Sequence, residues 1–153
     1  MSHAFAFAPR LLTILICATA APALAGELVV DQARVPLAAG ELSPTRAAPA
    51  AASMTVTNAG DTPQSVTGVY STDFARAELM TVTDGRMRSI ERLEFPAGTT
   101  RTLNADGDHV MLFEPLAPVR PGDSVRIFLE TADGTLVLVN ATAVAAETSP
   151  ETH

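Results

Sequence analysis

Residues 123–144 read DSVRIFLETADGTLVLVNATAV, and this stretch decides the fold class. Two runs of strand-forming residues flank Asp133-Gly134, a pair that tolerates the positive φ of a tight hairpin turn. In the first run Val125, Ile127 and Leu129 alternate with other residues and so share one face. We therefore predict an antiparallel hairpin with one face in a hydrophobic core.

The same pattern extends over the chain in both directions. Proline or glycine recurs about every eight to twelve residues between short runs of Val, Thr, Leu and Ile, which is typical of a β-sandwich or barrel. The candidate strands are Glu27–Val35, Ala51–Asn58, Gln64–Ser71, Ala75–Val82, Gly85–Glu91, Thr99–Asn104, His109–Glu114, Asp123–Thr131 and Thr135–Val144. Pro36–Ala52 is expected to form a long loop, and no segment after residue 26 has a sustained helical period. The fold class is all-β, with about eight to nine short strands.

The N-terminal segment has the features of a cleavable secretory signal. Arg10 precedes the apolar run Leu11–Ala18, and small residues follow, ending in Ala23-Leu24-Ala25. A membrane span needs roughly 20 apolar residues, and Pro22 cuts this run short. We expect a signal peptide at 1–25, one domain at 26–144 and a flexible tail at 145–153, with the mature protein in the periplasm. No membrane span is expected after signal cleavage.

Charge and cysteine content narrow the classes of partner. The chain carries 10 basic and 17 acidic residues, so loss of Arg10 leaves 9 against 17, a net charge of about −8. Proteins that bind nucleic acids or anionic membranes use clustered Lys and Arg. This acidic chain is therefore not expected to bind either of them. Cys17 is the one cysteine and lies within the presumed signal, so the mature chain lacks disulfides and thiol sites. A lipoprotein anchored through Cys17 is the alternative, although Ile16 stands where such signals carry a small residue.

The motifs of common enzyme classes do not occur. The chain contains no Gly-x-Ser-x-Gly motif, no glycine-rich phosphate loop, and no pair of histidines at i, i+4. Lone acidic residues such as Glu94 and Asp108 are more often surface groups than general acids or bases. We therefore predict that the protein is not an enzyme.

Sulfur and imidazole are grouped in His109-Val110-Met111, with Met87 and Met80 upstream. On a strand His109 and Met111 point to one side and Val110 to the other, so the imidazole and thioether are expected to face outward or toward a rim. Both are good ligands for Cu(I), a soft ion, and poor ligands for Mg²⁺ or Ca²⁺. The alternative that these methionines fill gaps in a core stays open at this point.

Other motifs surround these residues at characteristic spacings. Asn58-Ala59-Gly60-Asp61 ends a strand, Pro96-Ala97-Gly98 forms a turn between Met87 and His109, and Gly122-Asp123-Ser124-Val125 follows. Twenty-one residues, Arg88 to Asp108, separate Met87 from His109. From about Ala51 to Val144 the sequence resembles the PCu(A)C family of periplasmic copper chaperones.

The resemblance implies a cupredoxin-like, Greek-key β-sandwich that binds Cu(I) through Met80, Met87, His109 and Met111. It also implies delivery of copper to a periplasmic or membrane-anchored protein, such as the cytochrome oxidase subunit that carries the CuA site. Met80 stands where the family has histidine, and six residues separate it from Met87 where ten are usual. The alternative is a family member with a degenerate site that serves as a non-metal structural or protein-interaction domain.

Overall fold

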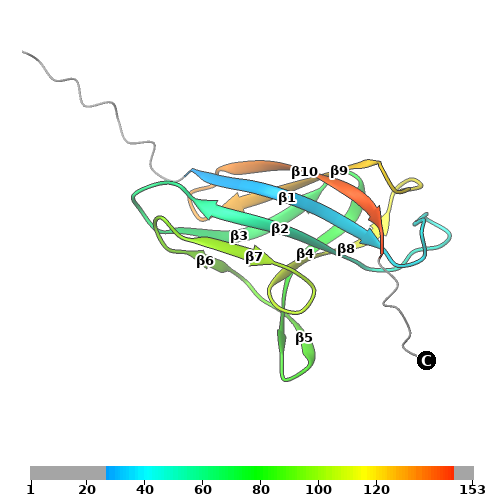
Figure 1. The fold of residues 1–153 in the computed structure, drawn as a ribbon, viewed down its shortest axis with the longest axis horizontal. Coiled ribbons are helices and arrows are strands. Elements are labelled where there is room, and N and C mark those ends of the chain that lie inside the picture. Colours follow the sequence, from blue (N-terminus) through cyan, green and yellow to red (C-terminus); the bar gives the residue numbers. More distant parts are fainter. Residues whose placement is uncertain (1–26, 147–153) are drawn as a thin grey trace, which may run out of the picture.

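The structure of the protein is a computed structural model, and the residues it describes are 27–146 (Figure 1). The predicted signal at 1–25 lies outside the described residues, as does most of the predicted tail. All the regular structure within 27–146 is β-strand. The described residues therefore include no helix that could cross a membrane. The ten strands are β1 (Leu28–Leu37), β2 (Ala50–Asn58), β3 (Gln64–Ser71), β4 (Phe74–Thr83), β5 (Arg86–Ser89), β6 (Leu93–Phe95), β7 (Thr100–Leu103), β8 (His109–Pro115), β9 (Ser124–Thr131) and β10 (Leu136–Ala145).

The strands form one hydrogen-bonded path in the order β5-β4-β8-β2-β1-β10-β9-β3-β6, with β7 paired to β2. One edge of β2 is shared: Ala50–Ala52 pair with β8, and Met54–Thr57 pair with β7. β1 runs along the other edge of β2 and pairs in parallel with β10. The sheet folds over on itself into two layers, and β5 with the end of β4 projects from the body (Figure 1). The predicted all-β sandwich is confirmed, with ten strands.

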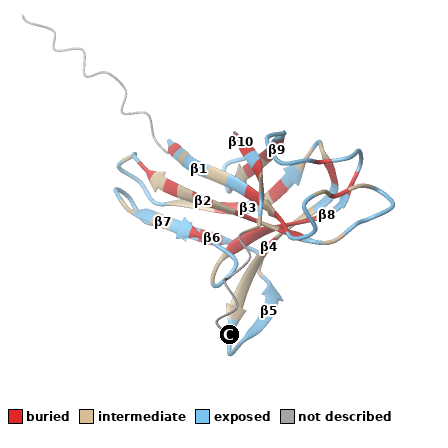
Figure 2. Ribbon diagram, turned by 45° about the vertical axis from the view of Figure 1, so that its right-hand side comes forward, coloured by how far each residue is buried: buried red, intermediate tan, exposed pale blue. Residues whose placement is uncertain are grey.

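Alternation along most of the strands places one side in a common apolar core (Figure 2), whereas all four residues of β5 are exposed. On β9, Val125, Ile127 and Leu129 are buried, as predicted. On β2, Met54 and Val56 are buried, and Thr55 between them is half-buried. Burial of such side chains contributes roughly 1.5–3 kcal/mol each and is the main source of stability in a fold without disulfides.

The two Asp-Gly pairs make different turns. Asp84 and Gly85 have φ values of 52° and 70°, so both residues of the β4–β5 turn adopt the left-handed region, as predicted for a two-residue hairpin loop. In the β9–β10 turn Gly134 has a φ of 86°, but Asp133 is not in that region. The amide of Gly134 donates to the carbonyl of Thr131. This second connection is therefore longer than the two-residue loop that the sequence suggests.

The side-chain amide of Asn58 stabilises the Asn-x-Gly-Asp turn through three hydrogen bonds. Its side chain is fully buried, and its Nδ2 donates to the carbonyls of Thr62 and Phe95, both at 2.8 Å. Its Oδ1 accepts the amide hydrogen of Gly60 at 3.0 Å. One amide group thus ties the end of β2 to the next turn and to β6.

Two sequence predictions about local structure need correction. Strand β6 was missed because three residues are too few to show a period. The predicted loop at Pro36–Ala52 is shorter, since β1 extends to Leu37 and β2 begins at Ala50. Within it Leu42 is buried and forms a backbone bridge with Val119, so tertiary contacts order this segment.

Candidate metal centre

Strand register brings Met80, His109 and Met111 onto one face of the sheet. Met80 on β4 lies directly opposite His109 on β8, and Glu78, two residues earlier on β4, lies opposite Met111. Directly opposite residues share a face, as do residues two apart on a strand, and opposite Cβ atoms lie about 4.5–5.5 Å apart. The thioether of Met80 and the imidazole of His109 are therefore nearest neighbours across the strands.

Met87 lies on the same face, on the far side of Met80. It pairs with Val82, and Ser89 pairs with Met80, so Met87 is the diagonal neighbour of Met80. Such diagonal pairs are about 7–8 Å apart, which is within reach for two long side chains. Met80 and Met87 therefore lie on the same face of the sheet although the hairpin that joins their strands is short. Met87 is 50% exposed and does not point into the core.

The prediction that His109 and Met111 face outward or toward a rim is wrong, whereas the predicted core position of Val110 is confirmed. His109 is 0% exposed and Met111 is 6% exposed, so these residues are as buried as Val110 on the core face. Strand alternation predicts which residues share a face, but it does not reveal whether other parts of the chain cover that face. β8 is an internal strand between β4 and β2, and the imidazole also turns back toward the loop that precedes it.

The buried imidazole has one nitrogen with a hydrogen-bond partner and one without. Nδ1 lies 2.9 Å from the carbonyl oxygen of Gly107. A carbonyl can only accept, so Nδ1 carries the proton and Nε2 of the neutral ring keeps its lone pair. Within residues 27–146, Nε2 of His109 is the one buried side-chain nitrogen or oxygen that lacks a hydrogen-bond partner. Leaving such a group unpaired costs about 1–3 kcal/mol, which a bound metal ion would offset.

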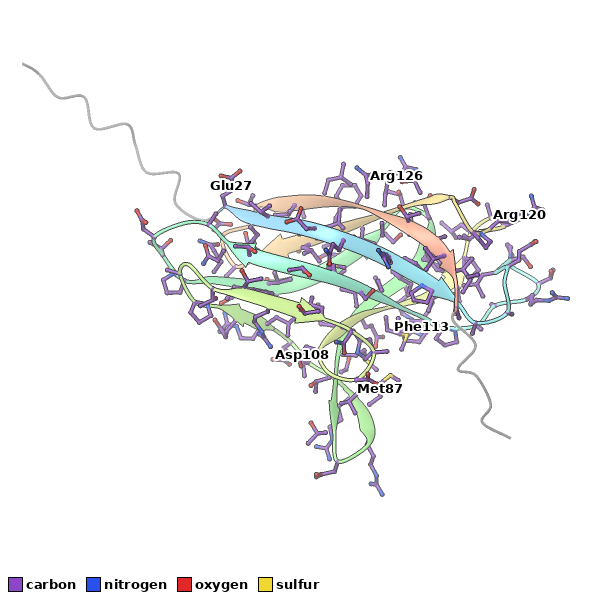
Figure 3. The ribbon with its side chains drawn as sticks, in the orientation of Figure 1. Glu27, Met87, Asp108, Phe113, Arg120 and Arg126 are labelled. Atoms are coloured by element: carbon purple, nitrogen blue, oxygen red, sulfur yellow. The ribbon has the colours of Figure 1, made fainter. Side chains whose placement is uncertain are left out.

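The loop before His109 is held in place by Arg101 and Asn104, which the sequence did not single out, and by Asp108, which the sequence suggested was a surface group. The amide of Asn104 donates to the carbonyl of Asp108 at 2.9 Å, and the amide of Gly107 donates to the carbonyl of Asn104 at 3.1 Å. The guanidinium of Arg101 on β7 pairs with the carboxylate of Asp108. In the view of Figure 3, Asp108 and Met87 both lie where the hairpin leaves the body. Asp108 thus pairs with Arg101 in the structure and is not free to bind a metal. In the sequence, its position next to His109 is the one feature that could have indicated this role.

The charges on this face are paired among themselves. Glu78 accepts from Arg76 at 2.6 Å and from Ser89 at 3.3 Å. The Arg76 guanidinium also lies 4.1 Å from the ring centre of Phe113. Within the described chain no three His, Cys, Asp or Glu side chains are grouped to hold a metal ion. The donors available here are therefore thioether sulfur and one imidazole nitrogen, a set that suits a soft monovalent ion.

Among residues 27–146, two groups have displaced pKa values, and they lie away from β4, β5 and β8, on β3 and in the β9–β10 turn. The pKa of Tyr70 is raised because its hydroxyl donates to the carboxylate of Glu130 at 2.6 Å. The pKa of Asp133 is lowered because its carboxylate accepts from the hydroxyl of Thr131 and the amide of Thr135. Both effects stabilise the β3–β9–β10 region and involve none of the candidate ligands.

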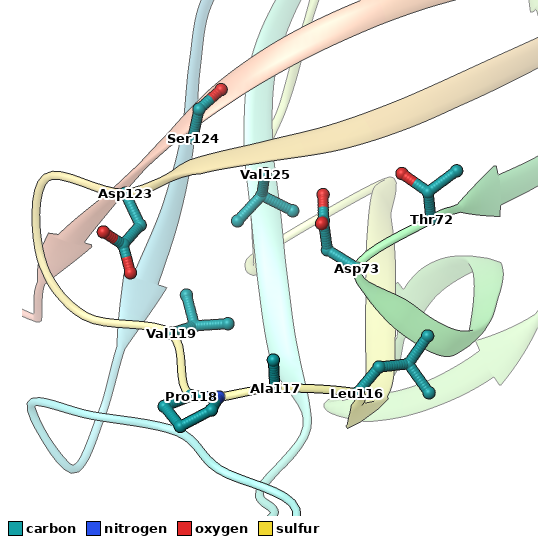
Figure 4. Close-up of a pocket in the computed structure, with 9 residues that line it drawn as sticks. All are labelled: Thr72, Asp73, Leu116, Ala117, Pro118, Val119, Asp123, Ser124 and Val125. Atoms are coloured by element: carbon teal, nitrogen blue, oxygen red, sulfur yellow. The ribbon is translucent and has the colours of Figure 1, made fainter.

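A hollow of about 300 Å³ lies elsewhere on the molecule, and Figure 4 shows its lining. Its two carboxylates already accept backbone hydrogen bonds. Asp73 accepts from the amide of Arg126, and Asp123 accepts from the amide of Arg120, both at 2.8 Å. None of the sulfur or imidazole groups lines this hollow, so it is separate from the candidate metal centre.

Comparison with known proteins agrees with the fold. A family model described as "Putative lipoprotein LpqE-like" matches residues 28–143. The solution structure of Cu(I)-DR1885 from Deinococcus radiodurans is 33% identical, with coverage of 83% of this chain and 81% of that chain and a TM-score of 0.55. The apo PCuAC domain from PmoF1 is 20% identical, with coverage of 79% and 96% and a TM-score of 0.64. The copper-bound PCuAC domain from PmoF2 is 20% identical, with coverage of 80% and 96% and a TM-score of 0.62. A search of curated protein sequences found no match. The cupredoxin-like β-fold is confirmed.

Proposed function

Because the chain belongs to the LpqE-like family, which is related to the PCuAC proteins, we propose that it is an exported protein that binds one Cu(I) ion and passes it to another protein. The ligands in this proposal are Met80, Met87, His109 and Met111. Copper is the cargo of this site and not a resident cofactor. The relatives whose structures are copper-bound, DR1885 and PmoF2, support this choice of ion.

The single observation that carries the proposal is the unpaired Nε2 of His109. The His109 side chain is on the face shared by Met80 and Met111, and the hydrogen bond to Gly107 selects the tautomer that leaves the Nε2 lone pair available. If His109 only filled space in the fold, the free-energy cost of burying Nε2 without a partner would have nothing to offset it. The hydrogen bond from Nδ1 to Gly107 also orients the ring and selects the tautomer in which Nε2 is the nitrogen that can bind a metal ion.

Each residue has a distinct role in the proposed site. His109 and Met111 form its buried floor, and the half-buried Met80 lies beside them on β4. Met87 covers the ion from the exposed edge strand β5. Thioether ligands carry no charge and no proton, so the ion can leave without any proton being returned to the sulfur. An exposed outer ligand lets a partner's ligand replace Met87 first, which suits a protein that transfers its metal.

Three finer features belong to the same proposal. The exported domain comprises residues 26–144, its location is the periplasm, and the receiving protein is a subunit of cytochrome oxidase that assembles the CuA site. A family of lipoproteins is compatible with export. The acidic net charge of the chain argues against nucleic acid as a partner.

Anaerobic titration of residues 26–153 with Cu(I), in competition with a colorimetric chelator, tests the proposal. We expect one ion per chain in the unaltered protein and a large loss of affinity in His109→Leu. Met54→Leu is the matched control, because Met54 is buried in the core, 1% exposed, and lies off this face. A stoichiometry near zero would leave the alternative of a structural or protein-interaction domain.

A further inference from the structure

Met87 differs from the other methionines of the described chain in its contact with solvent. It is 50% exposed, whereas Met111 is 6% and Met54 is 1% exposed, and Met80 is half-buried. It lies on β5, an edge strand whose four residues are all exposed, in the hairpin that projects in Figures 1 and 3. Dissolved oxidants therefore reach this thioether before they reach the others.

We propose that Met87 is a reversible oxidation site whose sulfoxide switches off Cu(I) binding, an inference that rests on the proposed function. The oxidant is a peroxide. The sulfur attacks one peroxide oxygen, the O–O bond breaks, and the sulfur is oxidised by two electrons to the sulfoxide while the peroxide is reduced to water. Methionine sulfoxide reductases return the thioether with two electrons from a pair of thiols, which become a disulfide while the sulfoxide oxygen leaves as water.

Oxidation changes the chemistry of the site in one step. A thioether is a soft donor that suits Cu(I), whereas a sulfoxide is polar and its exposed donor atom is a hard oxygen. Loss of the Met87 donor would leave Met80, His109 and Met111, and it would remove the group that covers the ion from the solvent side. The metal would then be bound more weakly and exchange faster.

The fold itself would tolerate this oxidation. Met87 packs little surface, and its neighbours Arg86 and Arg88 are exposed and polar. Oxidation of Met111 or Met54 would instead place a polar sulfoxide inside the packed sheet. The arrangement therefore directs oxidation to a proposed ligand, Met87, whose change leaves the core intact.

Mild treatment of the metal-free protein with hydrogen peroxide, followed by peptide mass mapping, tests the first half of the proposal. We expect Met87 to gain oxygen about eightfold faster than Met111, in proportion to their 50% and 6% exposures (50/6 ≈ 8). Faster oxidation of Met80 or Met111 would overturn the proposal. This measurement requires no copper, so its outcome is independent of the proposed function.

Anaerobic chelator competition on the singly oxidised protein tests the second half. We expect the Cu(I) affinity to fall at least about tenfold, with an unchanged thermal unfolding midpoint and recovery after reductase treatment. In Met87→Leu the affinity should be low from the start and insensitive to peroxide. Unchanged affinity of the oxidised protein would refute the switch while the proposed function stands. If the unoxidised protein binds no Cu(I), the proposed function and the switch both fail, whatever the selectivity of oxidation.

Discussion

Replacement of His109 by leucine should abolish tight Cu(I) binding without weakening the metal-free fold. The substitution removes the unpaired Nε2, which gains about 1–3 kcal/mol, and it loses the Nδ1 hydrogen bond to Gly107, which costs about 0.5–1.5 kcal/mol. Gly107 is half-buried, so water can reach its freed carbonyl. The two side chains are similar in volume, so the net change should lie between about 0.5 kcal/mol of lost stability and about 2.5 kcal/mol of added stability. A metal ligand that reduces the stability of the metal-free protein is the physical signature of a site kept for binding.

Two companion variants make this prediction specific. His109→Ala also removes the unpaired nitrogen but leaves a cavity, and it differs from His109→Leu by a buried leucine-to-alanine change that costs about 2–5 kcal/mol. Val110→Ala, on the opposite face of β8, should cost roughly 1–3 kcal/mol and leave the copper affinity largely unchanged.

Urea unfolding of the metal-free proteins and chelator competition for Cu(I) measure the two properties separately. In His109→Leu the copper affinity should fall by more than the about 10–100-fold effect that loss of an outer hydrogen-bond partner has at metal sites. A destabilisation of more than about 2 kcal/mol in His109→Leu would show that Nε2 is satisfied in the folded protein, for example by a buried water. Unchanged copper affinity would show that His109 is not a ligand.

Three further expectations can be measured independently. Met80→Leu should weaken Cu(I) binding less than His109→Ala does, because imidazole is the one nitrogen donor in the set; an equal or larger loss by chelator competition would contradict this. Asn58→Ala should lower the urea unfolding free energy by about 2–4 kcal/mol, since it leaves the buried carbonyl of Phe95 without its partner, and a change below about 1 kcal/mol would show that water replaces the amide. The mass of the exported protein should correspond to a chain that begins at Gly26; a lipid-modified Cys17, or retention of the first 25 residues, would be the contrary finding.

The sequence by itself determined the fold class and the identity of the candidate ligands. Alternation in residues 123–131, the Asp84-Gly85 turn and the spacing of turn residues are local features, and local sterics are enough to translate them into strands and hairpins. The resemblance to the PCu(A)C family, read from Asn58-Ala59-Gly60-Asp61 and His109-Val110-Met111, is confirmed by the comparisons. The two-residue alternation along a strand is also a local feature, and through it the register of the short hairpin places Met87 on the face of Met80.

Tertiary structure alone decided how deeply these residues are buried and what surrounds them. Alternation along a strand tells which side chains share a face. Whether that face meets water depends on strands and loops that are distant in sequence. For this reason the outward position predicted for His109 was wrong. The pairing of Arg101 with Asp108 and the bond from His109 to Gly107 depend on β7, β8 and their loop meeting in space. The packing of β7, β8 and their loop leaves Nε2 of His109 buried and without a hydrogen-bond partner. The sequence does not reveal this, because a hydrogen bond depends on where the partner group lies as well as on the residue itself.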